Sequence, residues 1–149
     1  SNSYNWRLSE IFALMNHTDA IKNVLLVDDD TNITFLTKLT LDGLTDWTVM
    51  EASSGAQALQ IVESFTPDLV LLDAMMPGMD GRTTYAKFRE IPALDSTYII
   101  FMTAKIQADE IGQFCDLGAE GVITKPFDPI TLVEEIERVI SQAKTARVK

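Results

Sequence analysis

Several features that would decide a protein's class are missing from this chain of 149 residues. Cys115 is the sole cysteine, so no disulfide can form within the chain. The apolar runs stay far below the ~20 residues of a membrane-spanning helix, and the first residues lack the basic region and apolar core of a signal peptide. These absences favour a cytoplasmic protein that contacts no membrane.

Basic residues are scarce as well. The chain has 12 lysines and arginines against 22 acidic residues, for a formal net charge of -10. An acidic surface repels polyanions, which argues against direct binding of nucleic acid or of an anionic membrane. Any DNA binding would therefore need another domain. The few basic residues near the end are spread out and are interpreted as a solvated helix face: Arg138, Lys144, Arg147 and Lys149.

The length suits one domain with a sizeable core, predicted at residues 20–144 with a short tail at 145–149. Residues 1–19 are predicted to be an N-terminal extension or linker, helical in part. Its start, Ser-Asn instead of Met, suggests a remnant of cloning and a piece cut from a longer protein. A linker helix, a dimer contact and an arm packed on the domain all remain open, since the extension can form an apolar stripe from Trp6, Leu8, Ile11, Phe12 and Met15.

Short apolar runs alternate with helical patterns from about Ile21 to Ala143. Five runs predict strands at 24–27, 47–52, 68–73, 98–104 and 121–124. Helical patterns follow at 31–44, 54–65, 82–90 and 108–119, and a last one begins near Asp128. Strands that are apolar on both faces imply a parallel sheet between helix layers, and right-handed crossovers then give a doubly wound α/β fold.

The helical patterns also predict caps and core-facing side chains. Asp30 or Thr31 can cap the first helix, Ser54 and Gln57 have the spacing of a capping box, and Asp128 can cap the last helix. The predicted inward residues are Ile33, Leu36, Leu39 and Thr40 in the first helix; Ala58, Leu59, Val62 and Phe65 in the second; Ile111, Phe114 and Cys115 in the fourth; and Leu132, Ile136, Val139 and Ile140 in the last.

Polar side chains follow the predicted strands. In a parallel sheet of this kind, ligands bind beyond the carboxyl ends of the strands. Asp30 alone is better explained as a helix cap, and Thr103 alone as an ordinary strand end. The joint pattern predicts one shared site built from Asp28, Asp29, Asp73, Thr103 and Lys125.

Clustered carboxylates need a cation. Two unit charges about 4 Å apart repel by roughly 4 kcal/mol at an effective dielectric of 20. The cluster holds no histidine or cysteine, so its oxygens suit Mg²⁺ better than zinc. The candidate ligands are Asp28, Asp29 and Asp73, helped by a loop carbonyl.

A carboxylate beside Mg²⁺ and facing a lysine can attack phosphorus and form an aspartyl phosphate. The metal and Lys125 would neutralise charge on the transferring group, and the Thr103 hydroxyl could donate a hydrogen bond to it. Because Pro126 follows Lys125, the peptide bond between them can be cis.

The segments "VLLVDDD", "PDLVLLDAMMPGMDG", "FMTA" and "GVITKPF" resemble the receiver domain of two-component response regulators. This resemblance implies a flavodoxin-like fold, with five parallel strands in the order 2-1-3-4-5 and five helices. It implies a signalling switch and not a metabolic enzyme. Asp73 would be the phosphoacceptor, Asp28, Asp29 and the Met75 carbonyl would hold Mg²⁺, and Thr103 and Lys125 would contact the phosphoryl group.

The resemblance also implies partners. A sensor histidine kinase or a histidine phosphotransfer protein would supply the phosphoryl group to the domain, and an unknown output domain or partner would receive the signal. The surface formed by the fourth helix, the fifth strand and the fifth helix is the expected output face and a possible homodimer contact.

Two positions depart from the family pattern. Val122 stands where relatives usually have an aromatic ring that turns inward, and a valine cannot replace that motion. Met75 stands where many relatives have a polar residue that orients water, which predicts slow self-dephosphorylation. Two alternatives remain: a haloacid-dehalogenase-type phosphatase, whose nucleophile follows the first strand, and a non-phosphorylated pseudo-receiver.

Overall fold

A computed structural model describes residues 21–104 and 107–148, with the side chain of Val148 left out. The predicted extension at residues 1–19 lies outside the described residues. The strands are β1 (Asn23–Val27), β2 (Thr48–Ala52), β3 (Leu69–Asp73), β4 (Tyr98–Ala104) and β5 (Gly121–Lys125). The helices are α2 (Thr31–Leu44), α3 (Gly55–Ile61), α4 (Gly81–Arg89), α5 (Ala108–Asp116) and α6 (Leu132–Val148), with a 3-10 turn, η1 (Pro92–Leu94).

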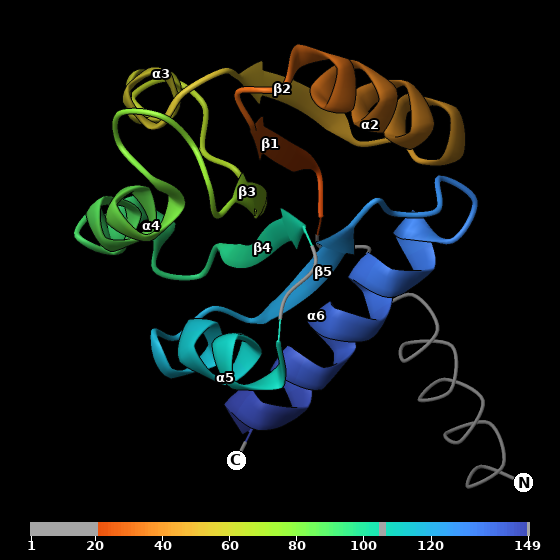
Figure 1. Cartoon of the computed structure of the whole chain (residues 1–149). Coiled ribbons are helices and arrows are strands. Elements are labelled where there is room, and N and C mark those ends of the chain that lie inside the picture. Colours follow the sequence, from red (N-terminus) through yellow and green to blue (C-terminus); the bar gives the residue numbers. More distant parts are fainter. Residues whose placement is uncertain (1–20, 105–106, 149) are drawn as a thin grey trace, which may run out of the picture.

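All five strands pair in parallel, in the order β2-β1-β3-β4-β5. The predicted doubly wound sheet and its strand order are therefore confirmed. In Figure 1, α2 and α6 cover one face of the sheet, and α3, α4 and α5 cover the other. No helix within the described residues is long and apolar enough to cross a membrane.

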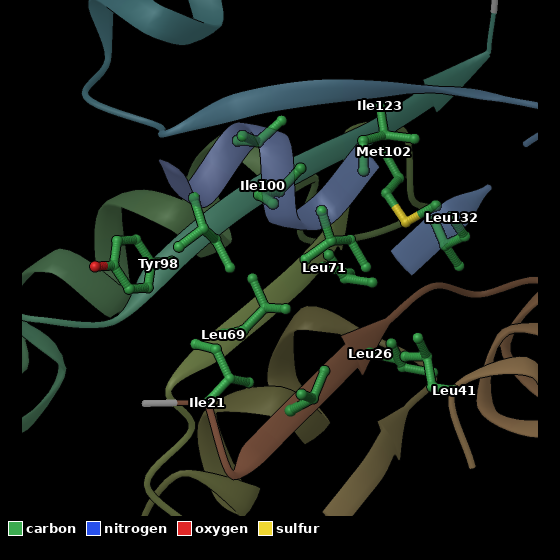
Figure 2. Packing of buried hydrophobic residues seen from close by; sticks show 14 of the residues in the cluster. Ile21, Leu26, Leu41, Leu69, Leu71, Tyr98, Ile100, Met102, Ile123 and Leu132 are labelled. Carbon is green, nitrogen blue, oxygen red and sulfur yellow. The ribbon is translucent and has the colours of Figure 1, made fainter. Parts of the chain in front are cut away.

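The core has one apolar cluster on each side of the sheet. All five residues of β3 are buried, because its side chains alternate between the two layers. Leu69 and Leu71 enter the cluster beneath α2 and α6, which Figure 2 shows from close by. Val70 and Leu72 enter the cluster beneath α3, α4 and α5. This continuous burial holds the last residue of β3, Asp73, at a fixed place on the edge of the sheet.

Helix α6 begins later than expected but buries the predicted face. Leu132, Ile136, Val139 and Ile140 are all buried, which confirms the predicted stripe. The prediction that Asp128 caps this helix is wrong. Its Oδ1 accepts from the Ile130 N–H at 2.9 Å, within a turn that precedes the helix.

The caps of α2 and α3 largely follow the sequence. Asp30 is the N-cap of α2, and its carboxylate accepts from the N–H groups of Asn32 and Ile33. Ser54 accepts from the Gln57 N–H at 3.0 Å. The Gln57 side chain accepts from the N–H of Ser53, one residue earlier than a capping box requires.

The predicted inward face of α2 is wrong in part. Leu36 is 44% exposed and Leu39 is 60% exposed, whereas Thr34, Thr37 and Leu41 are buried. Threonine can be buried here because its hydroxyl is satisfied within the helix: the Thr37 Oγ1 donates to the Ile33 carbonyl at 2.7 Å.

The predicted inward face of α5 is also wrong in part. Phe114 is buried as expected, but Cys115 is exposed and Ile111 is 38% exposed. Gly118 follows this helix with φ +106°, the left-handed conformation that commonly ends helices. Helix α5 therefore rests on the sheet through a narrower contact than its sequence suggested.

Candidate functional site

The predicted site residues meet at the carboxyl edge of the sheet. Asp28 directly follows β1, Asp73 ends β3, and Lys125 ends β5. The strand register places Asp73 beside Met102 and Thr103 beside Thr124, so the polar ends of β3, β4 and β5 are level.

A pocket of about 690 Å³ opens at this edge. Its walls include every predicted site residue: Asp28, Asp29, Asp73, Met75, Thr103 and Lys125. Glu110 of α5 also lines the pocket and was not predicted. The sequence offered one sign of this role, since Glu110 lies in the first turn of the helix after Thr103. Many exposed glutamates occupy such a position, so it does not single out a site residue.

Lys125 forms ion pairs with two of the acidic residues. Its Nζ lies 2.5 Å from Asp28 Oδ2 and 3.4 Å from Asp73 Oδ1. All three side chains are largely buried, with at most 13% of their surface exposed. A partly desolvated ammonium between two carboxylates holds both in place more firmly than a surface ion pair would.

The turn after Asp73 folds back against the strand end. The Met75 N–H donates to Asp73 Oδ1 at 3.2 Å, and the Gly81 N–H donates to the Ala74 carbonyl at 3.2 Å. A Cβ at Gly81 would lie 2.3 Å from the Asp73 carbonyl oxygen, so this close approach requires glycine. Met76 packs into the core, whereas Met75 is 76% exposed at the rim of the pocket.

The electrostatics of Asp73 reflect its burial. Desolvation raises the pKa of the Asp73 carboxyl to about 6, although the Met75 N–H opposes this change. The charge of Asp28 contributes to this rise in the pKa, and Lys125 opposes it. The site thus holds a carboxylate whose charge is costly until a cation or a positive partner balances it.

The acidic residues are arranged so that they could hold a divalent cation. Asp28, Asp29 and Asp73 each offer a carboxylate oxygen, and these atoms lie within 4.8 Å of one another. Three carboxylates against one nearby ammonium leave a net negative charge. Oxygen ligands with room for water in an open pocket are typical of Mg²⁺ sites.

Comparison with known proteins agrees with this geometry. The family model described as the response regulator receiver domain matches residues 24–137. The chain belongs to this receiver domain family. It is therefore a phosphorylation-activated switch of two-component signalling. Its fold and its strand order are those of a receiver domain.

The receiver domain is similar to proteins of known sequence and structure. It is 34% identical over 129 residues to the nitrate/nitrite response regulator protein NarL of Escherichia coli, an alignment that covers 82% of this chain and 59% of NarL. The chemotaxis response regulator CheY4 of Vibrio cholerae superposes with a TM-score of 0.74 at 28% identity, over 80% of this chain and 98% of CheY4. The beryllofluoride-activated DrrB receiver domain superposes with a TM-score of 0.68 at 27% identity, over 80% of this chain and 97% of that one.

The receiver domain spans little more than half the length of the curated relatives it matches. Within the family, receiver domains are phosphorylated by histidine kinases and regulate output domains.

The predicted cis bond between Lys125 and Pro126 is present. Val122 is partly buried against the cluster that contains Phe101 and Phe114.

Proposed function

We propose that this receiver domain accepts a phosphoryl group on Asp73 from a phosphohistidine and passes the signal on by changing conformation. One observation carries the proposal: the Asp73 carboxylate lies at the pocket wall, 3.4 Å from the Lys125 ammonium and within reach of Asp28 and Asp29. This arrangement fixes a nucleophile beside fixed charges that match a transferring anion.

The chemistry requires one bond to form and one to break. A carboxylate oxygen of Asp73 attacks phosphorus as the P–N bond of the phosphohistidine breaks. The leaving imidazole nitrogen keeps the electron pair and takes up a proton. The Lys125 ammonium lies where negative charge gathers on the phosphoryl oxygens, and the Thr103 hydroxyl at the pocket wall can donate a hydrogen bond to one of them.

The acidic trio fits Mg²⁺. Asp28, Asp29 and Asp73 would hold the ion together with the Met75 backbone carbonyl, which belongs to the turn folded over the pocket. When bound, Mg²⁺ supplies positive charge against the phosphoryl oxygens. Asp28 also accepts from the Asp30 N–H at 2.9 Å, which orients its carboxylate within the site.

The partners follow from the reaction. A sensor histidine kinase or a histidine phosphotransfer protein would be the donor, and an output domain or a separate partner would read the state. The surface of α5, β5 and α6 is the proposed output and homodimer face, since α5 follows Thr103 and α6 follows Lys125. A cytoplasmic location stays a prediction.

The experiment compares charge-neutral variants of two aspartates in the full chain. Incubation with acetyl phosphate and Mg²⁺, followed by intact-mass measurement, should add one phosphoryl group to the wild-type protein. Asp73→Asn should abolish the addition. Asp42→Asn is the matched control because Asp42 is exposed and pairs only with Lys38 among the described residues.

Beryllofluoride binding in the presence of Mg²⁺ gives a second readout, and it too should disappear in Asp73→Asn. Phosphorylation that persists in Asp73→Asn would refute the assignment of the acceptor. A wild-type protein that takes up neither group would instead favour the pseudo-receiver. Turnover of a small phosphomonoester would favour the phosphatase, although Asp73 ends the third strand and its place is not after the first.

A further inference from the structure

A second group of charged side chains lies at the edge of the sheet where the strands begin, opposite the phosphorylation pocket. Glu120 directly precedes β5, and only 9% of its side chain is exposed. Its carboxylate accepts from the Ile99 N–H at 2.6 Å. Two guanidiniums flank it, 3.3 Å away on Arg89 and 3.0 Å away on Arg147. A carboxylate this buried depends on such partners. We call Arg89, Glu120 and Arg147 the Glu120 cluster.

Arg89 connects the cluster to helix α4, of which it is the last residue. Its Nε donates to the Tyr85 hydroxyl at 3.1 Å, and its Nη1 donates to the carbonyls of Leu94 and Thr97 at 3.2 and 3.0 Å. Its Nη2 faces Glu120. The donors of a guanidinium are fixed in one plane, so the position of the whole group follows the positions of its acceptors.

Tyr85 connects the cluster to helix α5. Its side chain is buried, and its ring lies 5.6 Å from the ring of Phe101, which in turn lies 4.5 Å from that of Phe114 in α5. A Cβ on Gly118, two residues after the end of α5, would lie 2.8 Å from the Tyr85 hydroxyl oxygen. This hydroxyl is therefore packed against the backbone that follows α5. A displacement of that backbone moves the group that accepts from the Arg89 Nε.

Arg147 connects the cluster to the last turn of α6. Its guanidinium lies 4.1 Å from the centre of the Tyr98 ring, at the start of β4. The Arg147 side chain is 40% exposed, so its ion pair with Glu120 is weaker than a fully buried one and is easily released. The middle of α6 is held separately, by the burial of Ile136 and Ile140. The cluster therefore acts on the last turn and not on the middle of the helix.

We propose that Tyr85 and the Glu120 cluster form a relay that carries a displacement of α5 to the last turn of α6. The contacts run in the order Gly118, Tyr85, Arg89, Glu120 and Arg147. The relay rests on the proposed function, since a displacement of α5 is the conformational change that it transmits. Helix α5 follows Thr103, and within this fully described helix Phe114 alone is buried. The relay makes the last turn of α6 a second place where a partner can detect the phosphorylated state.

Hydrogen exchange measured by mass spectrometry on the full chain, with and without beryllofluoride and Mg²⁺, tests the relay. In the wild-type protein, beryllofluoride should speed the exchange of amides in α5 and, by about two- to fivefold, in residues 144–148. Exchange in residues 136–140 should not change. Tyr85→Phe removes one hydroxyl and with it the link to Arg89. In this variant α5 should still respond to beryllofluoride, and residues 144–148 should not.

Tyr98→Phe is the matched control, because it also removes one hydroxyl but keeps the ring next to Arg147, and both responses should persist. Arg147→Met breaks the last contact and should make residues 144–148 exchange quickly with or without beryllofluoride. Circular dichroism checks the fold of each variant. A last-turn response that survives Tyr85→Phe, or that is absent from a wild-type protein whose α5 responds, would overturn the relay alone. No response in either helix would overturn the proposed conformational change, and the relay with it.

Discussion

The helices that follow Lys125 and Thr103 are anchored to the sheet very differently. Helix α6 buries Leu132, Ile136, Val139 and Ile140. Its last turn is held further by Arg147, whose guanidinium lies 3.0 Å from Glu120 and 4.1 Å from the ring of Tyr98. Within α5, all of which the structure describes, Phe114 alone is buried.

The difference divides the pocket into a fixed side and a loosely held side. The charged groups of the pocket, Asp28, Asp73 and Lys125, are joined by ion pairs. Thr103 lies on the other side, and the helix after it has few buried contacts, which is typical of an element that opens locally. A switch needs both properties, since one side must hold the ligand while the other side responds to it.

The sharpest test of this comparison removes equal volumes from the two helices. Ile136→Ala should lower the free energy of unfolding by about 2–5 kcal/mol, because Ile136 is fully buried and leaves a cavity. Ile111→Ala in α5 should lower it by less than about 0.5 kcal/mol, since Ile111 is 38% exposed. Urea denaturation measures both, and equal losses would mean that α5 is anchored as firmly as α6.

The second test concerns the free-energy cost of the buried charge of Asp73, on the fixed side of the pocket. In the folded protein the pKa of Asp73 is raised from 3.8 to about 6, so between these pH values the folded state binds more protons than the unfolded state. Stability from this group is therefore present below about pH 4 and is lost as pH rises through 6. In metal-free buffer at pH 7, Asp73→Asn should be more stable by roughly 2 kcal/mol, after allowance for solvent in the pocket.

Thermal unfolding from pH 4 to pH 7 checks this prediction, with Asp80→Asn as the control. The Thr83 N–H holds the pKa of Asp80 below its usual value, so the contribution of Asp80 is lost as pH falls, the opposite sign. A loss of stability on neutralising Asp73 at pH 7 would show that Lys125 more than compensates for the burial of its charge. Added Mg²⁺ should stabilise the wild-type protein at pH 7 and have a smaller effect on Asp73→Asn.

Most of the residues on the fixed side of the pocket could be predicted from the sequence. The five apolar runs are local signals, and each of Asp28, Asp73 and Lys125 stands at or just after the end of its strand. In a parallel sheet these ends must meet, so the site could be assembled without any knowledge of side-chain contacts. The buried face of α6 was also predictable, because its apolar residues are spaced so that they fit one face of a helix.

The predictions from the sequence failed where the polarity of a residue does not decide whether its side chain is buried. Thr34 and Thr37 are buried because their hydroxyls bond to carbonyls of the preceding turn, an option that a hydropathy pattern does not include. Cys115 was predicted to face inward from the helical spacing of Ile111, Phe114 and Cys115, yet its side chain is exposed. The contacts of Glu120 with Arg89 and Arg147 join distant segments and leave no local signal.

The third test asks directly whether α5 opens. Backbone amides of α5 should exchange with solvent at least about tenfold faster than those in the middle of α6, because opening α5 exposes one buried side chain. Phe114→Ala should bring α5 close to the unprotected rate while α6 keeps its protection. It also removes the contacts of Phe114 with Phe101, at 4.5 Å between ring centroids, and with Arg82. Parallel loss of protection in both helices would show that they open as one unit.

The smallest expected effect concerns Met75, which lies on the pocket rim and belongs to neither helix. Its side chain is 76% exposed and apolar, so it offers no hydrogen bond to a water approaching the phosphoryl group. Met75→Asn supplies such a group and should speed the loss of phosphate from Asp73 by less than about tenfold, a change of up to 1.4 kcal/mol in the barrier. Met75→Leu is the control, because it keeps the rim apolar and should leave the rate unchanged. Phosphate release after removal of the donor gives both rates. A lifetime of seconds for the phosphorylated wild-type protein would show that an apolar side chain at the rim does not keep water from the site.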